Sequence, residues 1–120
     1  PGGLENFTEF LYTRAGFVSG PAGYGMDKSR TEALMREALA EAKRGEALGE
    51  VPVGALIFND SGIIARAHNL VENKGDATCH AEMLVLREAA KNLGKWRLSQ
   101  CSLVVTLEPC PMCIGAIVLS

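Results

Sequence analysis

Apolar residues recur with a helical period in two segments of the chain. One helix is predicted over about 30–45, where apolar positions are three or four residues apart. A second helix is predicted over about 80–92, with Thr78 as its N-cap and Gly94 just beyond its end. The positions that carry the first period are Met35, Leu39 and Ala42, and those that carry the second are Met83, Leu86 and Ala90.

Short apolar runs between these segments predict strands. Residues 53–58 form a compact apolar run, residues 59–62 have strong turn chemistry, and residues 63–68 resume strand-like sequence, which together predict a β-hairpin. Residues 69–78 are polar and predict a loop, and residues 102–107 predict a third strand. The order of helices and strands predicts a sheet covered by helices on both faces.

A third helix is predicted at the end of the chain. Pro109 and Pro111 suit a helix entry, because the first amides of a helix have no intrahelical partner. Residues 114–119 are apolar throughout, so this helix has to be buried. Little sequence follows to cover it, and we therefore expect a C-terminal truncation.

The first 25 residues differ in composition from the remainder. Residues 1–25 are rich in aromatic residues and glycine, whereas charged, alanine- and leucine-rich sequence begins at Met26. We interpret 1–25 as a poorly structured leader or extension and 26–120 as one domain. The alternative is a short helix near Leu4–Tyr12 that packs its aromatic residues on the domain.

Composition restricts the class of protein. With 120 residues, 48% hydrophobic residues, 22% charged residues and a net charge of −2, the chain is typical of one soluble globular domain. The charge provides no overall basic footprint for nucleic acid, although it does not exclude a local one. No apolar run approaches the roughly 20 residues of a membrane span, and no signal peptide is visible. Four cysteines without a secretory signal favour a reducing compartment, so we expect a cytoplasmic protein with no membrane association.

The stretch Glu108–Cys113, with Cys110 and Cys113 three residues apart, carries the first candidate chemistry. Such a pair can be a redox couple, half of a structural zinc site or part of a catalytic metal centre. Cysteines at positions i and i+3 of a helix share a face, which suits chelation. A helix N-terminus also favours the thiolate form that binds a metal. The pair alone does not decide between these possibilities.

His80 and Glu82 provide a second part of the pattern. His80 is one of two histidines and begins the predicted helix over 80–92. Residues at i and i+2 of a helix do not face each other, so Glu82 is not expected to share a metal shell with His80. Three protein ligands with an open position are typical of catalytic zinc, and a carboxylate beside that position can accept a proton from water.

With these residues the chain resembles the zinc-dependent cytidine/deoxycytidylate deaminase superfamily, whose motif is His-x-Glu followed by Pro-Cys-x-x-Cys. Among its members it looks most like the bacterial tRNA-specific adenosine deaminases, over about Met26–Ser120. The residues that carry the resemblance are Val51–Ala55, Asn69, His80–Glu82, Trp96–Leu98 and Val105–Cys113.

The resemblance implies a fold and a set of roles. The fold would be a three-layer α/β/α cytidine deaminase-like arrangement with a mixed sheet. The substrate would be adenosine at the wobble position of a tRNA anticodon loop, converted to inosine by a homodimer whose sites draw on both subunits. His80, Cys110 and Cys113 would be the ligands of Zn²⁺. Glu82 would carry the proton, and Asn69 and the Ala81 amide would contact the base.

Other functions remain open from the sequence. A free nucleobase deaminase of the guanine deaminase type shares the Pro-Cys-Pro-Met-Cys stretch and the Ala-Ile that follows. A non-catalytic zinc-binding subunit is a second alternative, against which Glu82 argues, and a redox protein is a third. His68 and Cys101 are interpreted as ordinary structural residues, and Cys79 as a buried small side chain, a spare ligand or an oxidation site.

Overall fold

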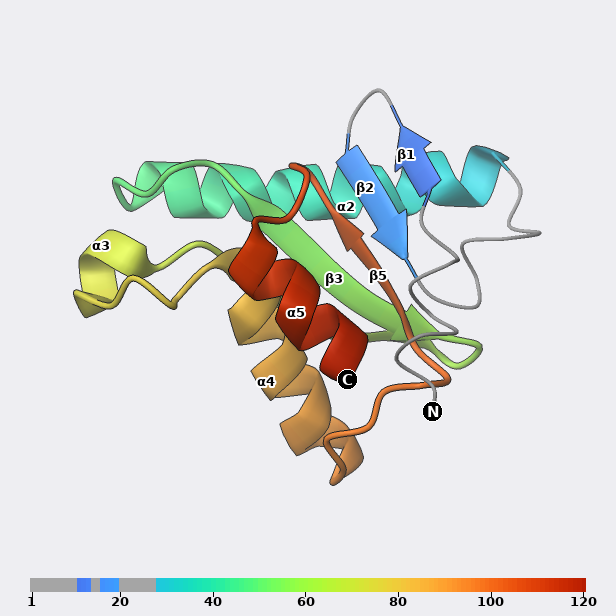
Figure 1. Ribbon diagram of the computed structural model, residues 1–120. Helices are drawn as coiled ribbons and strands as arrows, with labels where there is room; N and C mark the ends of the chain where they lie inside the picture. Colours follow the sequence, from blue (N-terminus) through green and yellow to red (C-terminus); the bar gives the residue numbers. More distant parts are fainter. Residues whose placement is uncertain (1–10, 14–15, 20–27) are drawn as a thin grey trace.

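The computed structural model describes residues 11–13, 16–19 and 28–120 of the chain (Figure 1). The helices predicted over 30–45 and 80–92, the hairpin and the C-terminal helix are all confirmed, with ends that differ by a few residues. In chain order the elements are β1 (Leu11–Thr13), β2 (Gly16–Ser19), α2 (Lys28–Ala47), β3 (Gly54–Asn59), β4 (Gly62–His68), α3 (Val71–Lys74), α4 (Ala81–Leu93), β5 (Ser102–Val105) and α5 (Pro111–Leu119).

The strands form one five-stranded sheet in the order β1-β2-β5-β3-β4. Strand β5 lies beside β3, with Ala55 opposite Val105 and Leu56 opposite Val104. The α/β class is confirmed. A mixed sheet was expected, whereas all four strand pairings among the described residues are antiparallel.

Side-chain alternation along the central strands creates two cores, one on each face of the sheet. Helix α2 covers one face, and α4 and α5 cover the other (Figure 1). This is the three-layer α/β/α arrangement. The residues buried on the α2 side are Met35, Ala38, Leu56, Phe58 and Val104. Those on the opposite side include Ala55, Ile57, Val85, Ala89, Leu103, Val105 and Ile117.

Helix α2 approaches the start of β3 very closely at Gly54. A Cβ atom placed on Gly54 would overlap the carbonyl oxygen of Ala38 and lie 2.6 Å from the amide nitrogen of Ala42. Backbone atoms of a helix interior cannot move aside cheaply, so glycine is required here for the helix to reach the sheet. The contact fixes where the end of α2 lies relative to β3.

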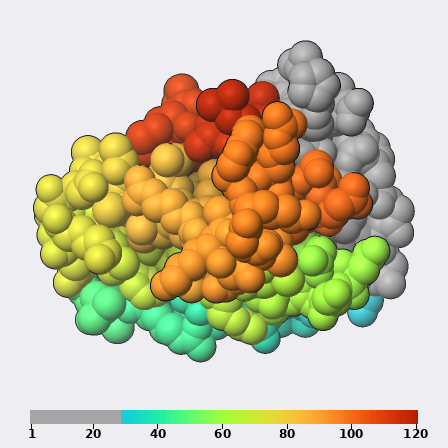
Figure 2. Space-filling model, turned by 90° about the horizontal axis from the view of Figure 1, so that it is seen from below, coloured from blue at the N-terminus to red at the C-terminus, as the bar shows by residue number. Residues whose placement is uncertain are grey.

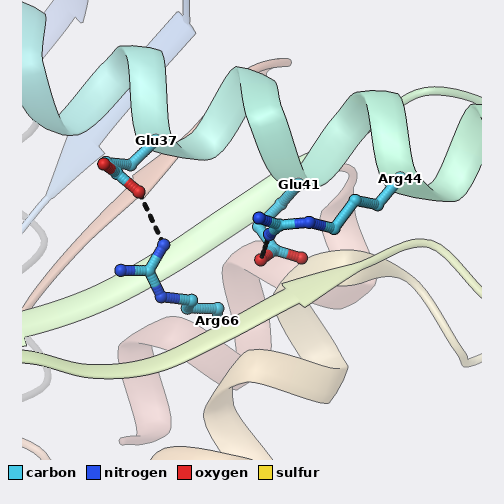
Figure 3. A network of polar contacts seen from close by, with 4 residues as sticks. All are labelled: Glu37, Glu41, Arg44 and Arg66. Atoms are coloured by element: carbon cyan, nitrogen blue, oxygen red, sulfur yellow. Dashed lines mark hydrogen bonds and ion pairs between the residues drawn. The ribbon is translucent and has the colours of Figure 1, made fainter.

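Charged side chains lie on the side of α2 that faces the edge strand β4, and one ion pair joins the two elements (Figure 3). A guanidinium nitrogen of Arg66 lies 2.6 Å from a carboxylate oxygen of Glu37, and Arg44 contacts Glu41 on the same helix. Arg66 and Glu37 are both largely exposed, so solvent screens their attraction and we assign the pair a minor role in stability.

Two expectations for the segment before α4 are wrong. Residues 69–78 were expected to be a loop, but they contain the one-turn helix α3. Thr78 was expected to cap α4, but the N-cap is His80, and the Thr78 hydroxyl donates to a carboxylate oxygen of Asp76 instead. Seen from below, α3 forms one end of the molecule next to α4 (Figure 2).

Part of the segment interpreted as a leader takes part in the sheet. Strand β2 pairs with β5, with Phe17 opposite Val105 and Ser19 opposite Leu103. The remaining residues of 1–25, and most of the alternative helix near Leu4–Tyr12, lie outside the described residues. The boundary between 1–25 and 26–120 stays a prediction. No described helix combines the length and apolar character needed to cross a membrane.

Candidate metal centre

The first turns of α4 and α5 lie together on one face of the sheet and carry the candidate ligands. His80 is the N-cap of α4 and Cys110 is the N-cap of α5, both with extended backbone and without a side-chain capping hydrogen bond. Pro111 follows Cys110 as the first helical residue, where its missing N–H costs nothing. Cys113 is one turn further along and is fully buried. The two helix starts therefore bring three candidate ligands, one imidazole and two thiols, close together.

The three ligand atoms have the spacing of a tetrahedral zinc site. The Sγ atoms of Cys110 and Cys113 are 3.6 Å apart, and the His80 Nδ1 lies 3.6 Å from the first and 3.5 Å from the second. Tetrahedral zinc, with Zn–S bonds of about 2.3 Å and Zn–N bonds of about 2.0–2.1 Å, requires separations of about 3.8 Å between sulfurs and about 3.6 Å between sulfur and nitrogen. The donor set fits the metal.

Only these three residues form such a cluster within the described part of the chain. Three protein ligands leave a tetrahedral ion with one further position, as in catalytic rather than structural zinc sites. Cys79 precedes His80 and is buried, yet it is not a member of the cluster. Cys101 is also buried outside it and fits the interpretation as a small core residue. His68 lies on β4, away from the cluster.

The electrostatics of the cluster also favour a cation. Burial raises the pKa of the Cys113 thiol above its usual range, and the Glu82 carboxylate and the Cys110 thiol raise it further. Negative charge on the protein groups alone is therefore unfavourable at this point. A divalent cation inverts this balance, because a coordinating thiol is deprotonated outright.

Glu82 lies in the first turn of α4 and is 4% exposed. It is outside the ligand cluster, but its carboxylate contacts the Cys113 thiol. No N–H group among the described residues donates to this carboxylate. A buried acid without such donors beside a metal site can exchange a proton, which a fully hydrogen-bonded structural acid does less readily.

A cavity of about 240 Å³ opens beside the cluster. Its lining includes five of the six residues that sequence analysis assigned to chemistry or to base binding, and Cys113 is the one that does not line it. The full lining is Val51, Val53, Asn69, His80, Ala81, Glu82, Leu107, Glu108 and Cys110. A larger open hollow of about 600 Å³ lies between β4 and α4, and its lining includes none of the metal-ligand residues, so we assign the chemistry to the smaller cavity.

Asn69 presents a hydrogen-bond donor to this cavity. Its side chain is 9% exposed, and its Oδ1 accepts the N–H of Val71 at 3.2 Å. The oxygen is thus occupied, while the side-chain nitrogen has no acceptor among the described residues. The Ala81 amide begins α4, where helical N–H groups lack intrahelical partners. Both groups can donate to a polar ligand.

Sequence reasoning missed Glu50, which is 4% exposed and accepts the backbone N–H groups of Glu72 and Asn73. Burial opposes ionisation of its carboxyl, but the hydrogen bonds from Asn73 and Glu72 outweigh this and lower its pKa. The sequence offered no signal for this role, because α3 itself was not predicted, and its N-cap residue Leu70 provides no side-chain oxygen.

Comparisons with known proteins agree with this geometry. Residues 28–120 match the family model for the cytidine and deoxycytidylate deaminase zinc-binding region. The chain is 56% identical over 92 residues to the tRNA-specific adenosine deaminase of Bacillus subtilis, an alignment that covers 77% of this chain and 57% of that protein. The chain thus spans little more than half the length of this relative.

Two solved structures are similar at the same level. One belongs to a study of A-to-I editing by tRNA:A34 deaminases at the wobble position of transfer RNA, with a TM-score of 0.69 and 44% identity over 72% of this chain and 62% of that one. The other is guanine deaminase from Bacillus subtilis, with a TM-score of 0.69 and 40% identity over 77% of this chain and 57% of that one. The fold alone does not separate these two activities.

Proposed function

Because the chain belongs to the cytidine and deoxycytidylate deaminase zinc-binding family, we propose that it provides the metal centre of a zinc-dependent hydrolytic deaminase that converts adenosine to inosine at the wobble position of tRNA. The observation that carries the proposal is the ligand triangle of His80, Cys110 and Cys113 with the non-ligand acid Glu82 beside it. The 56% identity to a tRNA-specific adenosine deaminase supports the substrate class.

The reaction replaces the exocyclic amine of the base by oxygen, consuming one water and releasing ammonia. His80, Cys110 and Cys113 would hold the zinc ion, which would act as a Lewis acid and lower the pKa of a bound water toward neutrality. Glu82 accepts the proton of the attacking water, delivers it to the ring nitrogen next to the reacting carbon, and then assists the departure of ammonia.

The cavity residues orient the base for this step. Asn69 donates its side-chain N–H to the base, and the Ala81 amide at the start of α4 provides a second donor. Burial of Glu82 and Asn69 limits the access of bulk water, which strengthens both contacts. These donors would bind the edge of a nucleotide base that is turned out of its stack, as in other nucleobase deaminases.

Guanine deamination is the second candidate, because the structural likeness to guanine deaminase equals that to the tRNA enzyme. The buried acid Glu82 outside the metal shell argues against a non-catalytic zinc-binding subunit, and the position of His80 beside both thiols argues against a redox pair.

We also propose that the protein is located in the cytoplasm and assembles as a homodimer. The tRNA substrate class and the four free thiols support the location. Sedimentation equilibrium tests the assembly.

The test uses the full-length gene product loaded with zinc. It is assayed against an adenosine-containing anticodon stem-loop, free adenosine, adenine, guanine and cytosine, with Glu82→Gln as the matched variant. We expect inosine from the stem-loop and a loss of about 10²–10⁴-fold in Glu82→Gln with zinc retained. Guanine turnover with an inert stem-loop contradicts the tRNA assignment, and a zinc-free folded protein contradicts the deaminase assignment.

A further inference from the structure

We propose that Glu50, which lies outside the cavity, is a positioning residue that holds Asn69 in place by capping α3 from the end of α2. The inference rests on the proposed function only for what Asn69 binds, and the position of Asn69 itself is measurable without any substrate. Three structural links connect Glu50 to the cavity.

The first link is the cap. The Oε1 of Glu50 accepts the amide of Glu72 at 3.0 Å, and its Oε2 accepts the amide of Asn73 at 2.8 Å and the Asn73 side-chain nitrogen at 2.6 Å. These hydrogen bonds lower the pKa of the Glu50 carboxyl and so favour its ionised form. Hydrogen bonds to an ionised carboxylate are stronger than those between neutral groups. The N-cap residue of α3, Leu70, contributes no side-chain bond of its own.

The second link is to a rigid support. The Glu50 amide donates to the carbonyl oxygen of Gly45 at 3.0 Å, and the Asn73 side chain donates to the carbonyl oxygen of Leu48 at 3.1 Å. Gly45 lies in the last turn of α2, a helix of 20 residues packed on the sheet, and Leu48 is the first residue after it. Helix α3 is therefore attached to one of the most extensive elements of the fold.

The third link leads from α3 to the cavity. The first residue of α3, Val71, donates its amide to the Asn69 Oδ1, and Leu70 donates its amide to the carbonyl oxygen of Cys79 at 3.0 Å. The Val71 bond fixes which end of the Asn69 side chain remains as a donor, and the Leu70 bond attaches the same turn to the residue before His80. Displacement of α3 would therefore act on the cavity through Asn69, whose side chain is bonded directly to the helix.

Hydrogen bonding has to carry this arrangement, because α3 has no buried residue of its own. A four-residue helix is too short to be stable by itself, and it gains little from apolar burial. The Glu50 carboxylate contributes three of the bonds that hold it. No other carboxylate among the described residues accepts N–H groups from α3.

The first experiment measures backbone hydrogen exchange by NMR on the zinc-loaded full chain and on Glu50→Gln. We expect the amides of Glu72 and Asn73 to exchange at least about tenfold faster in the variant, with a parallel increase at Val71 and Leu70. The Val85 amide in the middle of α4 should not change. Faster exchange confined to Glu72 and Asn73 overturns the inference, because Glu50 is then a local cap only.

Two further variants keep this test decisive. Asn73→Ala removes only the side-chain donor of an exposed residue, and we expect the same pattern of exchange with a smaller increase. Glu41→Gln removes a carboxylate of similar burial on α2 that contacts Arg44, and we expect no change at Val71 or Leu70. If Glu41→Gln reproduces the pattern, the effect reflects general loosening of α2 and the inference fails.

The second experiment is a double-mutant cycle with the anticodon stem-loop as substrate. Glu50→Gln and Asn69→Ala should each raise KM, and the combination should be no worse than Asn69→Ala alone, because the two residues then act through the same contact. Independent, multiplying effects overturn the inference. An inert wild-type enzyme contradicts the proposed function instead, and the exchange experiment still decides the role of Glu50.

Discussion

Two carboxylates in this molecule are buried to the same extent and have opposite surroundings. Glu82 and Glu50 are each 4% exposed. Glu50 receives three N–H donors and joins α2 to α3, whereas Glu82 receives none among the described residues and contacts the Cys113 thiol. A buried charge with its donors in place stabilises a structure. The proposed proton-transfer role of Glu82 fits its lack of donors, whereas the three donors of Glu50 fit a structural role.

The largest expected effect concerns the metal centre itself. Cys113→Ser should abolish stoichiometric zinc binding and remove the stabilisation that a bound ligand provides, which is about 4 kcal/mol when the ligand exceeds its Kd 1,000-fold. The measurement is zinc content by atomic emission together with thermal unfolding. If the two regions are independent, amide exchange at Glu72 and Asn73 remains slow in this variant.

The control for this prediction is Cys101→Ser, since Cys101 is a buried thiol outside the ligand cluster. It should retain one zinc per chain. Loss of zinc in both variants would show that metal binding depends on the general integrity of the core and would contradict the assignment of the ligand cluster.

The next prediction exchanges the two acids for amides and compares the signs of the effects. Glu50→Gln should lower the midpoint of thermal unfolding, because the amide nitrogen of glutamine cannot accept the Asn73 donors. Glu82→Gln should leave it unchanged or raise it, with a gain of up to about 1 kcal/mol, as is common where function requires an unsatisfied buried group. Differential scanning calorimetry of both zinc-loaded variants measures this, and a fall of equal size in both would remove the distinction.

A smaller effect is expected in acid. The pKa of Glu50 is lowered from 4.5 in the folded chain, so its ionised form stabilises the fold above pH 4.5, and this stabilisation disappears as the pH falls through the folded value. His68 contributes to the lowering through its charge. The unfolding midpoints of the wild type and of Glu50→Gln should therefore differ at neutral pH. The difference should shrink as the pH falls from 4.5 through the lower folded value. A constant difference at low pH would contradict the assignment.

The smallest effect is expected at the surface contact between α2 and β4. Arg66→Ala removes the exposed ion pair with Glu37 and should leave zinc content, amide exchange at α3 and turnover within experimental error of the wild type. A measurable change in zinc content would contradict this prediction and would mean that the contact between α2 and β4 affects the metal centre.

Two of the three metal ligands could be predicted from sequence because they are close together in the chain. Cys110 and Cys113 are three residues apart at a helix start, so helical geometry alone brings their sulfur atoms together. His80 could be assigned as the third ligand only through the family pattern, because 30 residues separate it from Cys110. The roles of Glu82, Asn69 and Ala81 in catalysis and binding stay predictions.

The anchor of α3 could not be predicted, because its bonds are not local. Glu50 lies 22 and 23 residues before its partners Glu72 and Asn73, and no spacing rule relates them. The order of the strands in the sheet also could not be predicted from the pattern of apolar residues. Alternation identifies the two faces of β3 and β5, but it does not specify that β5 lies between β2 and β3.

The position of β5 in the sheet determines when the sheet can form during synthesis of the chain. Helix α2 and the β3–β4 hairpin contact residues close in sequence and can form as they leave the ribosome, whereas the centre of the sheet closes only when residues 102–105 have emerged. The cysteine ligands follow still later. A nascent chain is therefore expected to acquire zinc only after the centre of the sheet has closed, and arrested chains that end before Cys110 should bind none.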